Sequence, residues 1–188
     1  MAAIFRDSRK VEANFSIRLV ISDHENAPGL RKAAAFNIPG YCLPPGKFRD
    51  KDAQERQICA LLEQEGIELV CLAGYMRLIG PVLLEKFTGR IMNIHPSLLP
   101  SFPGLHAQRQ ALRHGQKISG CTVHFVDSGL DSGPIIVQQA VQVRATDSED
   151  SLSQRILRQE HRLYPRAIRL YFAGRLQIRG RTVIIADK

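Results

Sequence analysis

One apolar run constrains the fold of this chain more than any other feature of the sequence. Residues 67–73 (IELVCLA) follow Gly66 and form a near-continuous series of apolar side chains. A strand that is covered on both faces has this pattern, because neither face meets water. Such strands belong to parallel sheets with helices on both faces, so the run predicts an α/β architecture.

The rest of the chain alternates between strand-like and helix-like segments. Residues 15–22 (FSIRLVIS) are rich in β-branched and aromatic side chains, which favours a strand. Residues 26–36 have helical spacing and a proline near their start, which favours a helix. The same reasoning predicts strands at 38–43, 90–95, 121–126 and 134–143, helices at 1–10, 50–65, 108–114 and 148–172, and a hairpin at 175–185. We therefore expect a Rossmann-like, mostly parallel sheet flanked by helices.

Length and hydropathy restrict the class of protein. A chain of 188 residues can bury roughly 70% of the surface that its unfolded form exposes, and we see no repeat or linker, so we expect one domain over 1–188. The longest apolar runs are far shorter than the ~20 residues of a membrane helix. No charged-then-apolar leader opens the chain, so we expect a cytoplasmic protein without a membrane partner.

Charge and cysteine content narrow the partners. The formal net charge of +8 would attract polyanions, including nucleotides and polyglutamylated cofactors. The chain has no Trp, and its basic residues are spread over the expected helices, so we do not expect nucleic acid as a partner. The four cysteines lie far apart without a CxxC pair, which predicts neither a disulfide framework nor a zinc site.

A polar pair stands at the end of the strand expected at 90–95. Asn93 and His95 are two residues apart, so both side chains point to one face while Ile94 points into the sheet. Open α/β sheets bind ligands at the carboxyl ends of their strands, and His95 falls at such an end. The pair is a catalytic candidate, although the same pattern also occurs at ordinary polar strand ends.

Asp131 is the third candidate. It lies between Gly129 and Gly133 in a loop whose backbone can bend sharply and aim a carboxylate. A carboxylate close to an imidazole keeps the ring cationic near neutral pH. The alternative is that Asp131 only forms the turn, which is a common role of Asp beside Gly.

Three long segments carry a family resemblance. They are NIHPSLLPSFPGLHAQRQAL from residue 93, VHFVDSGLDSGPIIVQQAV from residue 123 and QEHRLYP from residue 159. These segments closely resemble the glycinamide ribonucleotide transformylases of purine synthesis, and the match extends from Met1 to the C-terminal tail. The resemblance implies the formyltransferase fold, with Asn93, His95 and Asp131 as the catalytic set.

The resemblance also implies a reaction. The primary amine of 5′-phosphoribosylglycinamide attacks the formyl carbon of the co-substrate 10-formyltetrahydrofolate, and the oxygen of the tetrahedral intermediate becomes anionic. A cationic His95 and the amide of Asn93 would donate to that oxygen, and one such donor is often worth ~3 kcal/mol at the transition state. Asp131 would hold His95 protonated and position a water that relays the proton of the amine. We expect no metal, because no cluster of ligating residues with suitable spacing occurs.

The resemblance places further residues around the two substrates. The pterin pocket would be lined by Met76, Arg77, Leu78, Ile79, Asn93, Val126 and Asp127, with His124 in a supporting position. Residues 76–79 could instead form a buried turn with a solvated arginine. The resemblance also places Lys51 near the folate, where the family usually has Arg. Lysine keeps the positive charge but cannot form the two parallel hydrogen bonds that a guanidinium makes to a carboxylate.

Two further residues are assigned to the ribonucleotide. Glu160 resembles the family residue that binds the ribose hydroxyls, and otherwise it is a plain acid on a helix surface. His106 is expected on the same, substrate-binding side. We expect small molecules as partners and a monomer or homodimer.

The sequence departs from the family at its start. Family members open with a strand and a Gly-Ser-Asn loop that holds the 5′-phosphate, whereas this sequence starts at the helix that follows. We therefore expect an N-terminally truncated domain in which Met1 is an internal methionine of a longer protein. These 188 residues alone should then be poorly stable and bind the ribonucleotide weakly, because a strand in mid-sheet is missing.

Other functions share the Asn/His/Asp site. A formyltetrahydrofolate hydrolase would use water as the acceptor, but such proteins usually carry a regulatory domain. Methionyl-tRNA formyltransferases need a further C-terminal domain for tRNA. An inactive folate-binding remnant is the alternative of a different class, and retention of all three catalytic residue types argues against it.

Overall fold

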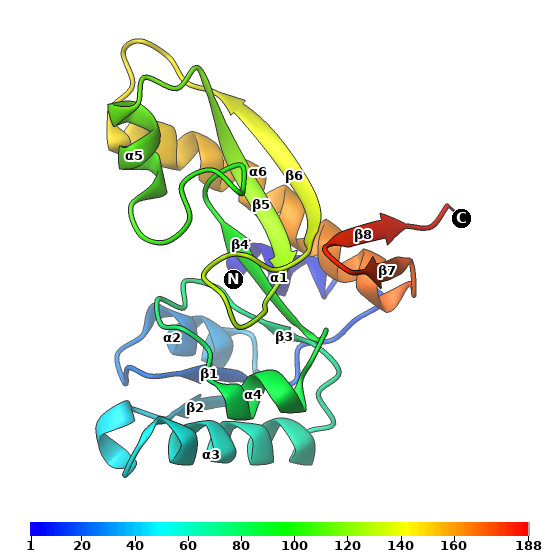
Figure 1. Ribbon diagram of the computed structural model, residues 1–188. Coiled ribbons are helices and arrows are strands. Elements are labelled where there is room, and N and C mark those ends of the chain that lie inside the picture. Colours follow the sequence, from blue (N-terminus) through cyan, green and yellow to red (C-terminus); the bar gives the residue numbers. More distant parts are fainter. Residues whose placement is uncertain (188) are drawn as a thin grey trace.

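The computed structural model describes residues 1–187 and has a mixed α/β architecture (Figure 1). The helices are α1 (Ala2–Asp7), α2 (Pro28–Ala35), α3 (Lys51–Gln64), α4 (Pro81–Lys86), α5 (Ala107–Arg113) and α6 (Glu149–Phe172), with a 3-10 turn η1 (Pro45–Lys47). The strands are β1 (Val20–Ser22), β2 (Gly40–Cys42), β3 (Val70–Cys71), β4 (Ile91–His95), β5 (Ile118–Phe125), β6 (Ile135–Gln142), β7 (Leu176–Arg179) and β8 (Thr182–Ile185). The expected α/β class, the C-terminal hairpin and most of the expected elements are confirmed.

The strands form two separate sheets. A six-stranded sheet has the order β3-β4-β5-β6-β8-β7, and β1 and β2 form a two-stranded sheet of their own. The pairs β1/β2, β3/β4 and β6/β8 are parallel, whereas β5 runs antiparallel to both β4 and β6. In Figure 1, β1 and β2 lie with α2, α3 and α4 in the lower part, while β5, β6, α5 and α6 lie in the upper part.

The long helix α6 organises the main hydrophobic core. Its first turn is capped by Ser148, whose hydroxyl accepts from the N–H of Ser151 in a capping box. Leu152 and Ile156 are completely buried in the core that α6 forms with β5 and β6. The Tyr164 hydroxyl reaches the carbonyl oxygens of Leu72 and Met92, at 2.9 and 2.8 Å, and so ties α6 to the ends of two strands.

Two strands are shorter than the sequence predicts. The strand expected at 15–22 is regular only over Val20–Ser22, and the one expected at 67–73 only over Val70–Cys71. Among the described residues, β1 pairs only with β2 and β3 pairs only with β4, so each has one edge without a strand partner. A strand ladder is defined by hydrogen bonds to a neighbouring strand. The apolar residues that flank β1 and β3 form no such bonds at the open edge, so the regular strands are short.

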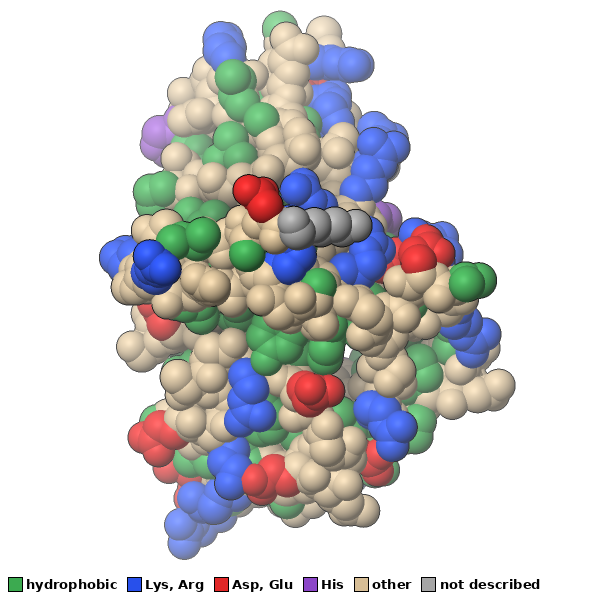
Figure 2. Space-filling view, turned by 90° about the vertical axis from the view of Figure 1, so that its right-hand side faces the viewer, with side chains coloured by type: hydrophobic (Ala, Val, Ile, Leu, Met, Phe, Trp, Pro, Cys, Tyr) green, Lys and Arg blue, Asp and Glu red, His purple; other side chains and the backbone are tan. Residues whose placement is uncertain are grey.

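A large apolar cavity lies between the two sheets. Its volume is about 730 Å³, and its wall includes residues 19–22 and 70–72 together with the apolar side chains Ile4, Phe15, Ile17, Leu69, Ile168 and Phe172. Figure 2 shows hydrophobic side chains at mid-height, between the upper and lower parts of the molecule. The missing pairing and the cavity therefore occur at the same place.

The short helix α4 was not expected from the sequence. Pro81 occupies its first turn, and the buried carboxylate of Glu55 accepts from the N–H groups of Gly80 and Leu83, at 2.5 and 3.1 Å. A Cβ at Gly80 would approach the Glu55 carboxylate oxygens to 2.7 Å, so any other residue there would force the carboxylate to shift. The cap comes from α3, which is why local sequence did not reveal it.

Candidate active site

Strand β4 presents the polar pair as the sequence predicts. Asn93 and His95 stand two residues apart on β4, and His95 is its last residue. In the antiparallel ladder to β5, Asn93 faces His124 and His95 faces Thr122. Because β4 is paired with β5 at both positions, the register of this ladder sets the backbone positions of both candidates.

Asp131 reaches this pair from the loop between β5 and β6. Its backbone is left-handed, with φ near +49°, which is uncommon for a residue other than glycine. One carboxylate oxygen, Oδ2, accepts from the N–H of Gly104 at 2.8 Å and lies 3.2 Å from His95 Nδ1. The other, Oδ1, accepts from Asn93 Nδ2 at 3.4 Å. The three expected catalytic residues therefore meet in one site.

The ring of His95 has a polar partner at each nitrogen. Nε2 lies 2.8 Å from the carbonyl oxygen of Phe102, and Nδ1 lies 3.2 Å from Oδ2 of Asp131. The residue is 4% exposed, so both contacts are made in a site from which most water is excluded. These two contacts fix the orientation of the ring on β4.

His124 is a fourth member of the site. Its Nδ1 lies 2.8 Å from the carbonyl oxygen of Phe125, which leaves Nε2 as an acceptor 3.4 Å from Asn93 Nδ2. Burial lowers the pKa of His124, and this lowering favours the neutral ring. The hydrogen bond to Phe125 and the charge of Asp131 offset part of the effect. The sequence suggested only a supporting position, and the signal for its place beside Asn93 was the antiparallel register of β4 and β5.

The residues expected at the pterin form two groups. Met76 and Leu78 are strongly exposed, 75% and 59%, on the loop between β3 and α4. Arg77 donates to the side chain of Gln54 at 3.2 Å, so it is anchored to α3 and not simply solvated. Lys51 begins α3, with its ammonium 3.9 Å from Glu55, whereas Ile79 packs in the hydrophobic cluster beside α3 and α4.

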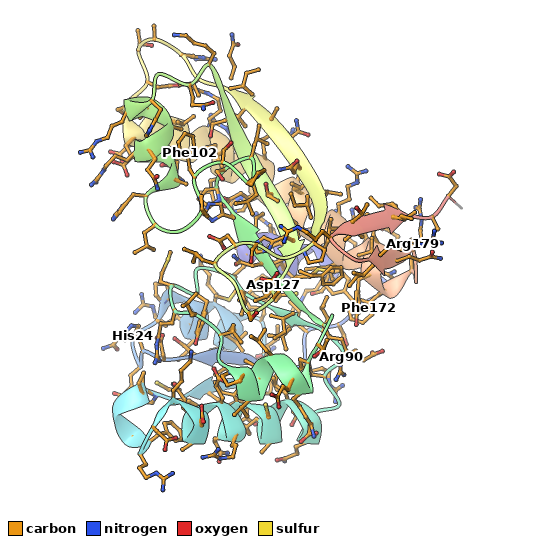
Figure 3. The ribbon with its side chains drawn as sticks, viewed as in Figure 1. His24, Arg90, Phe102, Asp127, Phe172 and Arg179 are labelled. Carbon is orange, nitrogen blue, oxygen red and sulfur yellow. The ribbon has the colours of Figure 1, made fainter. Side chains whose placement is uncertain are left out.

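Val126 and Asp127 follow the end of β5. The N–H of Val126 donates to the carbonyl of Ile91 at 2.9 Å, which extends the contact with β4. Asp127 accepts from Ser132 Oγ at 2.7 Å and from the N–H of Gly129 at 3.1 Å, so its carboxylate closes the loop that carries Asp131. Figure 3 shows Asp127 in this loop, between the upper and lower parts of the molecule.

Glu160 and His106 lie apart from the catalytic set. Glu160 is half-buried on α6, where burial raises its pKa and the nearby Met1 ammonium opposes that shift. His106 is exposed and caps α5 in a left-handed conformation. Among the described residues, neither side chain forms a hydrogen bond or ion pair with Asn93, His95 or Asp131.

Three further observations bear on metal binding, on membrane helices and on the large cavity. Within residues 1–187, no group of three or more His, Cys, Asp or Glu side chains is placed to hold a metal ion. No helix in the same range has the length and apolar character needed to cross a membrane. The expected catalytic residues do not line the large cavity, although Ile79 of the expected pterin residues does.

The fold and the site define a formyl transferase. The model of the formyl transferase family matches residues 1–168, and the chain belongs to this family. It is 46% identical to the phosphoribosylglycinamide formyltransferase of Bacillus subtilis over 154 residues, which are 82% of this chain and 79% of the relative. The resemblance drawn from the motifs is thereby confirmed.

Solved structures agree with this assignment. Glycinamide ribonucleotide transformylase 1 from Symbiobacterium toebii superposes with a TM-score of 0.96 and 49% identity, covering 98% of this chain and 87% of that one. A formyltetrahydrofolate deformylase from Burkholderia mallei gives 0.87 and 30% identity, covering 99% of this chain and 65% of that one. The deformylase shares the fold but is less similar in sequence.

Proposed function

We propose that this chain transfers the formyl group of 10-formyltetrahydrofolate to the amine of 5′-phosphoribosylglycinamide, a step of de novo purine biosynthesis. The observation that carries the proposal is the contact of Asn93, His95 and Asp131, with His95 placed between a carbonyl and a carboxylate. The similarity to phosphoribosylglycinamide formyltransferases over most of the chain supports the choice of acceptor.

The geometry accounts for the chemical step. The amine nitrogen forms a bond to the formyl carbon, and the formyl oxygen takes up the electron pair of the C=O double bond. We assign Asn93 Nδ2 and the His95 ring to that oxyanion, and both already lie beside the Asp131 carboxylate. Because the fold positions both groups before the substrate arrives, only the exchange of an existing contact for one to the oxyanion is needed as the charge develops.

Proton movement completes the reaction. The attacking amine becomes an ammonium, and its proton must reach N10 of the folate before the C–N10 bond breaks. Asp131 is 13% exposed and accepts from Gly104 and Asn93, so a water can approach its carboxylate and relay the proton. Collapse of the intermediate then returns the oxygen to a carbonyl and releases tetrahydrofolate.

Binding roles are part of the same proposal. Lys51, Met76, Arg77, Leu78, Ile79, Val126 and Asp127 are assigned to the folate, together with Asn93. The exposure of Met76 and Leu78 supports this assignment, because exposed apolar side chains on a loop can cover a planar ring. Glu160 and His106 are assigned to the ribonucleotide. The protein would act in the cytoplasm on small molecules, as a monomer or homodimer.

The domain organisation is also a proposal. We infer a single formyltransferase domain in which a further strand, parallel to β1 and β3, occupies the cavity between them. Its support is the coincidence of two open strand edges with an apolar space of about 730 Å³. A strand followed by a Gly-Ser-Asn loop, encoded in frame upstream of Met1, is the expected source, and DNA sequence without them would contradict the idea.

The function is tested by supplying each acceptor in turn. Purified protein, with and without the inferred strand, is mixed with 10-formyltetrahydrofolate and either 5′-phosphoribosylglycinamide or water alone, and products are measured by mass spectrometry. Formylated ribonucleotide is expected only when the amine is present. Release of formate at the same rate in both mixtures would identify a hydrolase, and folate binding without turnover in either protein would identify an inactive remnant.

A further inference from the structure

Three neighbouring strands carry a line of polar residues that ends at His95. His95 on β4 stands opposite Thr122 on β5, and Thr122 stands opposite Gln138 on β6. Residues that face each other across adjacent strands project from the same side of a sheet. The side chains of Thr122 and Gln138 therefore lie on the side from which His95 projects.

The Thr122 hydroxyl is fully used in this arrangement. Its oxygen accepts from the N–H of Leu99 at 3.1 Å and from Gln138 Nε2 at 2.9 Å, and it donates to the carbonyl of Ser97 at 2.7 Å. The residue is completely buried. A buried hydroxyl with all its partners satisfied fixes their positions, because losing any one leaves a buried polar group unpaired.

Gln138 holds the same segment from the next strand. We call the hydrogen bonds of Thr122 and Gln138 to residues 97–99 the clamp, with Thr122 as its inner half and Gln138 as its outer half. Its Nε2 donates to Thr122 and also to the carbonyl of Leu99 at 2.8 Å. Leu99 is thus held at both its N–H and its C=O, the first by Thr122 and the second by Gln138. Much of the Gln138 side chain is exposed, so burial alone does not explain why an amide stands there.

The clamped segment leads directly to the catalytic residues. Ser97 Oγ donates to the carbonyl of Ser101 at 2.5 Å, and the next carbonyl, that of Phe102, lies 2.8 Å from His95 Nε2. Two residues later, Gly104 donates its N–H to Asp131. The loop 96–104 therefore supplies one contact to the His95 ring and one to the Asp131 carboxylate, from a backbone that Thr122 and Gln138 hold.

We propose that Gln138, acting through Thr122 and the Leu99 carbonyl, is a positioning residue that sets the place of His95 and Asp131. This inference rests on the proposed formyl transfer for its kinetic consequence. Its structural part concerns the order of loop 96–104 alone. Neither Gln138 nor Thr122 would touch substrate, so the loss of the clamp should lower kcat with little change in KM.

The test compares two neighbouring glutamines. Gln138→Met keeps the length of the side chain but removes the donor. Gln139→Met is the matched control. Gln139 is the next residue on β6, and among the described residues its side-chain amide donates only to the carbonyl of Ala140. We expect kcat to fall on the order of tenfold in Gln138→Met, with KM for both substrates within about twofold, since small misplacements of catalytic groups are costly. Gln139→Met should behave as the unaltered protein.

A second pair probes the inner half of the clamp. Thr122→Val removes the hydroxyl, whereas Thr122→Ser keeps it, so the serine variant should retain kcat and the valine variant should lose at least as much as Gln138→Met. Equal kcat in Gln138→Met and Gln139→Met would overturn the kinetic part of the inference.

Hydrogen exchange separates the clamp from the proposed function. Exchange of the backbone N–H groups of Leu99 and Gly104 should accelerate roughly tenfold in Gln138→Met and remain unchanged in Gln139→Met. This measurement needs no turnover, so it decides the structural claim even if no formyl transfer is found. Unchanged exchange in Gln138→Met would overturn the inference, whereas altered exchange without any transfer would count against the proposed function only.

Discussion

Two regions of the molecule differ in how completely their strands are paired. Strand β5 is bonded to β4 on one edge and to β6 on the other, and most of its residues are buried. Strands β1 and β3 have one open edge each and face a cavity of about 730 Å³. In Figure 1 the first region lies in the upper part, and β1 lies in the lower part.

The difference shows where precision in this protein comes from. Asn93, His95, Thr122 and His124 belong to strands whose register is fixed by ladders, and their contacts follow from that register. The residues beside the cavity have their apolar faces in place, but the backbone pairing that would hold them is incomplete among the described residues. Small side-chain changes in the first region should therefore alter the geometry of the site. Truncation of side chains beside the cavity should change the free energy of unfolding little.

The largest expected effect comes from the charge of Asp131. Asp131→Asn keeps the shape but replaces the carboxylate that lies 3.2 Å from His95 Nδ1 with a neutral amide. We expect kcat to fall roughly a thousandfold, a loss within the range seen when one member of a preorganised catalytic set is disabled. Steady-state kinetics with saturating substrates measure it.

The control lies in the same loop. Asp127→Asn changes the charge of a carboxylate that closes the turn and does not contact His95, so kcat should change far less. Similar losses in both variants would mean that loop closure, and not the charge at position 131, governs activity.

A pair of isoleucine truncations compares the two regions directly. Ile156 is completely buried in the core of α6, β5 and β6, so Ile156→Ala should lower the free energy of unfolding by about 2–5 kcal/mol. Ile17 lines the cavity and already lacks neighbours on one side, so Ile17→Ala should cost less than about 1 kcal/mol. Urea denaturation followed by circular dichroism gives both values. Comparable losses would show that the cavity is filled in solution.

The smallest expected effect is a dependence of stability on pH. Burial lowers the pKa of His124 below its ordinary value of 6.5. The unfolded chain then binds a proton more readily than the folded one, so this contribution to stability is complete above pH 6.5 and is lost as the pH falls below it. The free energy of unfolding should decrease between about pH 7.5 and about pH 5.5.

Replacement of His124 isolates this contribution. His124→Gln keeps a hydrogen-bonding side chain without a group that titrates in this range, so the decrease over the same interval should be smaller. An identical pH profile in the unaltered protein and the variant would assign the dependence to other groups.

Much of the site was predictable from the sequence for a local reason. Asn93 and His95 share a face because strand side chains alternate, and Gly133 lets the loop that carries Asp131 pass close to the Phe125 carbonyl. The capping box of α6 was anticipated in part by Ser148 before acidic residues, and the hairpin at the C-terminus by its β-branched residues. Each of these features depends on residues close together in the chain.

The remaining features required the fold. The Phe102 carbonyl at His95, the clamp of Thr122 and Gln138, and the cap of α4 by Glu55 all join residues from separate elements. The sequence overestimated the strands at 15–22 and 67–73, because apolar and β-branched side chains predict extended backbone but not a bonded neighbour. By itself the sequence determined which side chains could act and which face they would take. Tertiary structure decided which partners they met, because hydrogen bonds between distant segments depend on how sheets and helices pack.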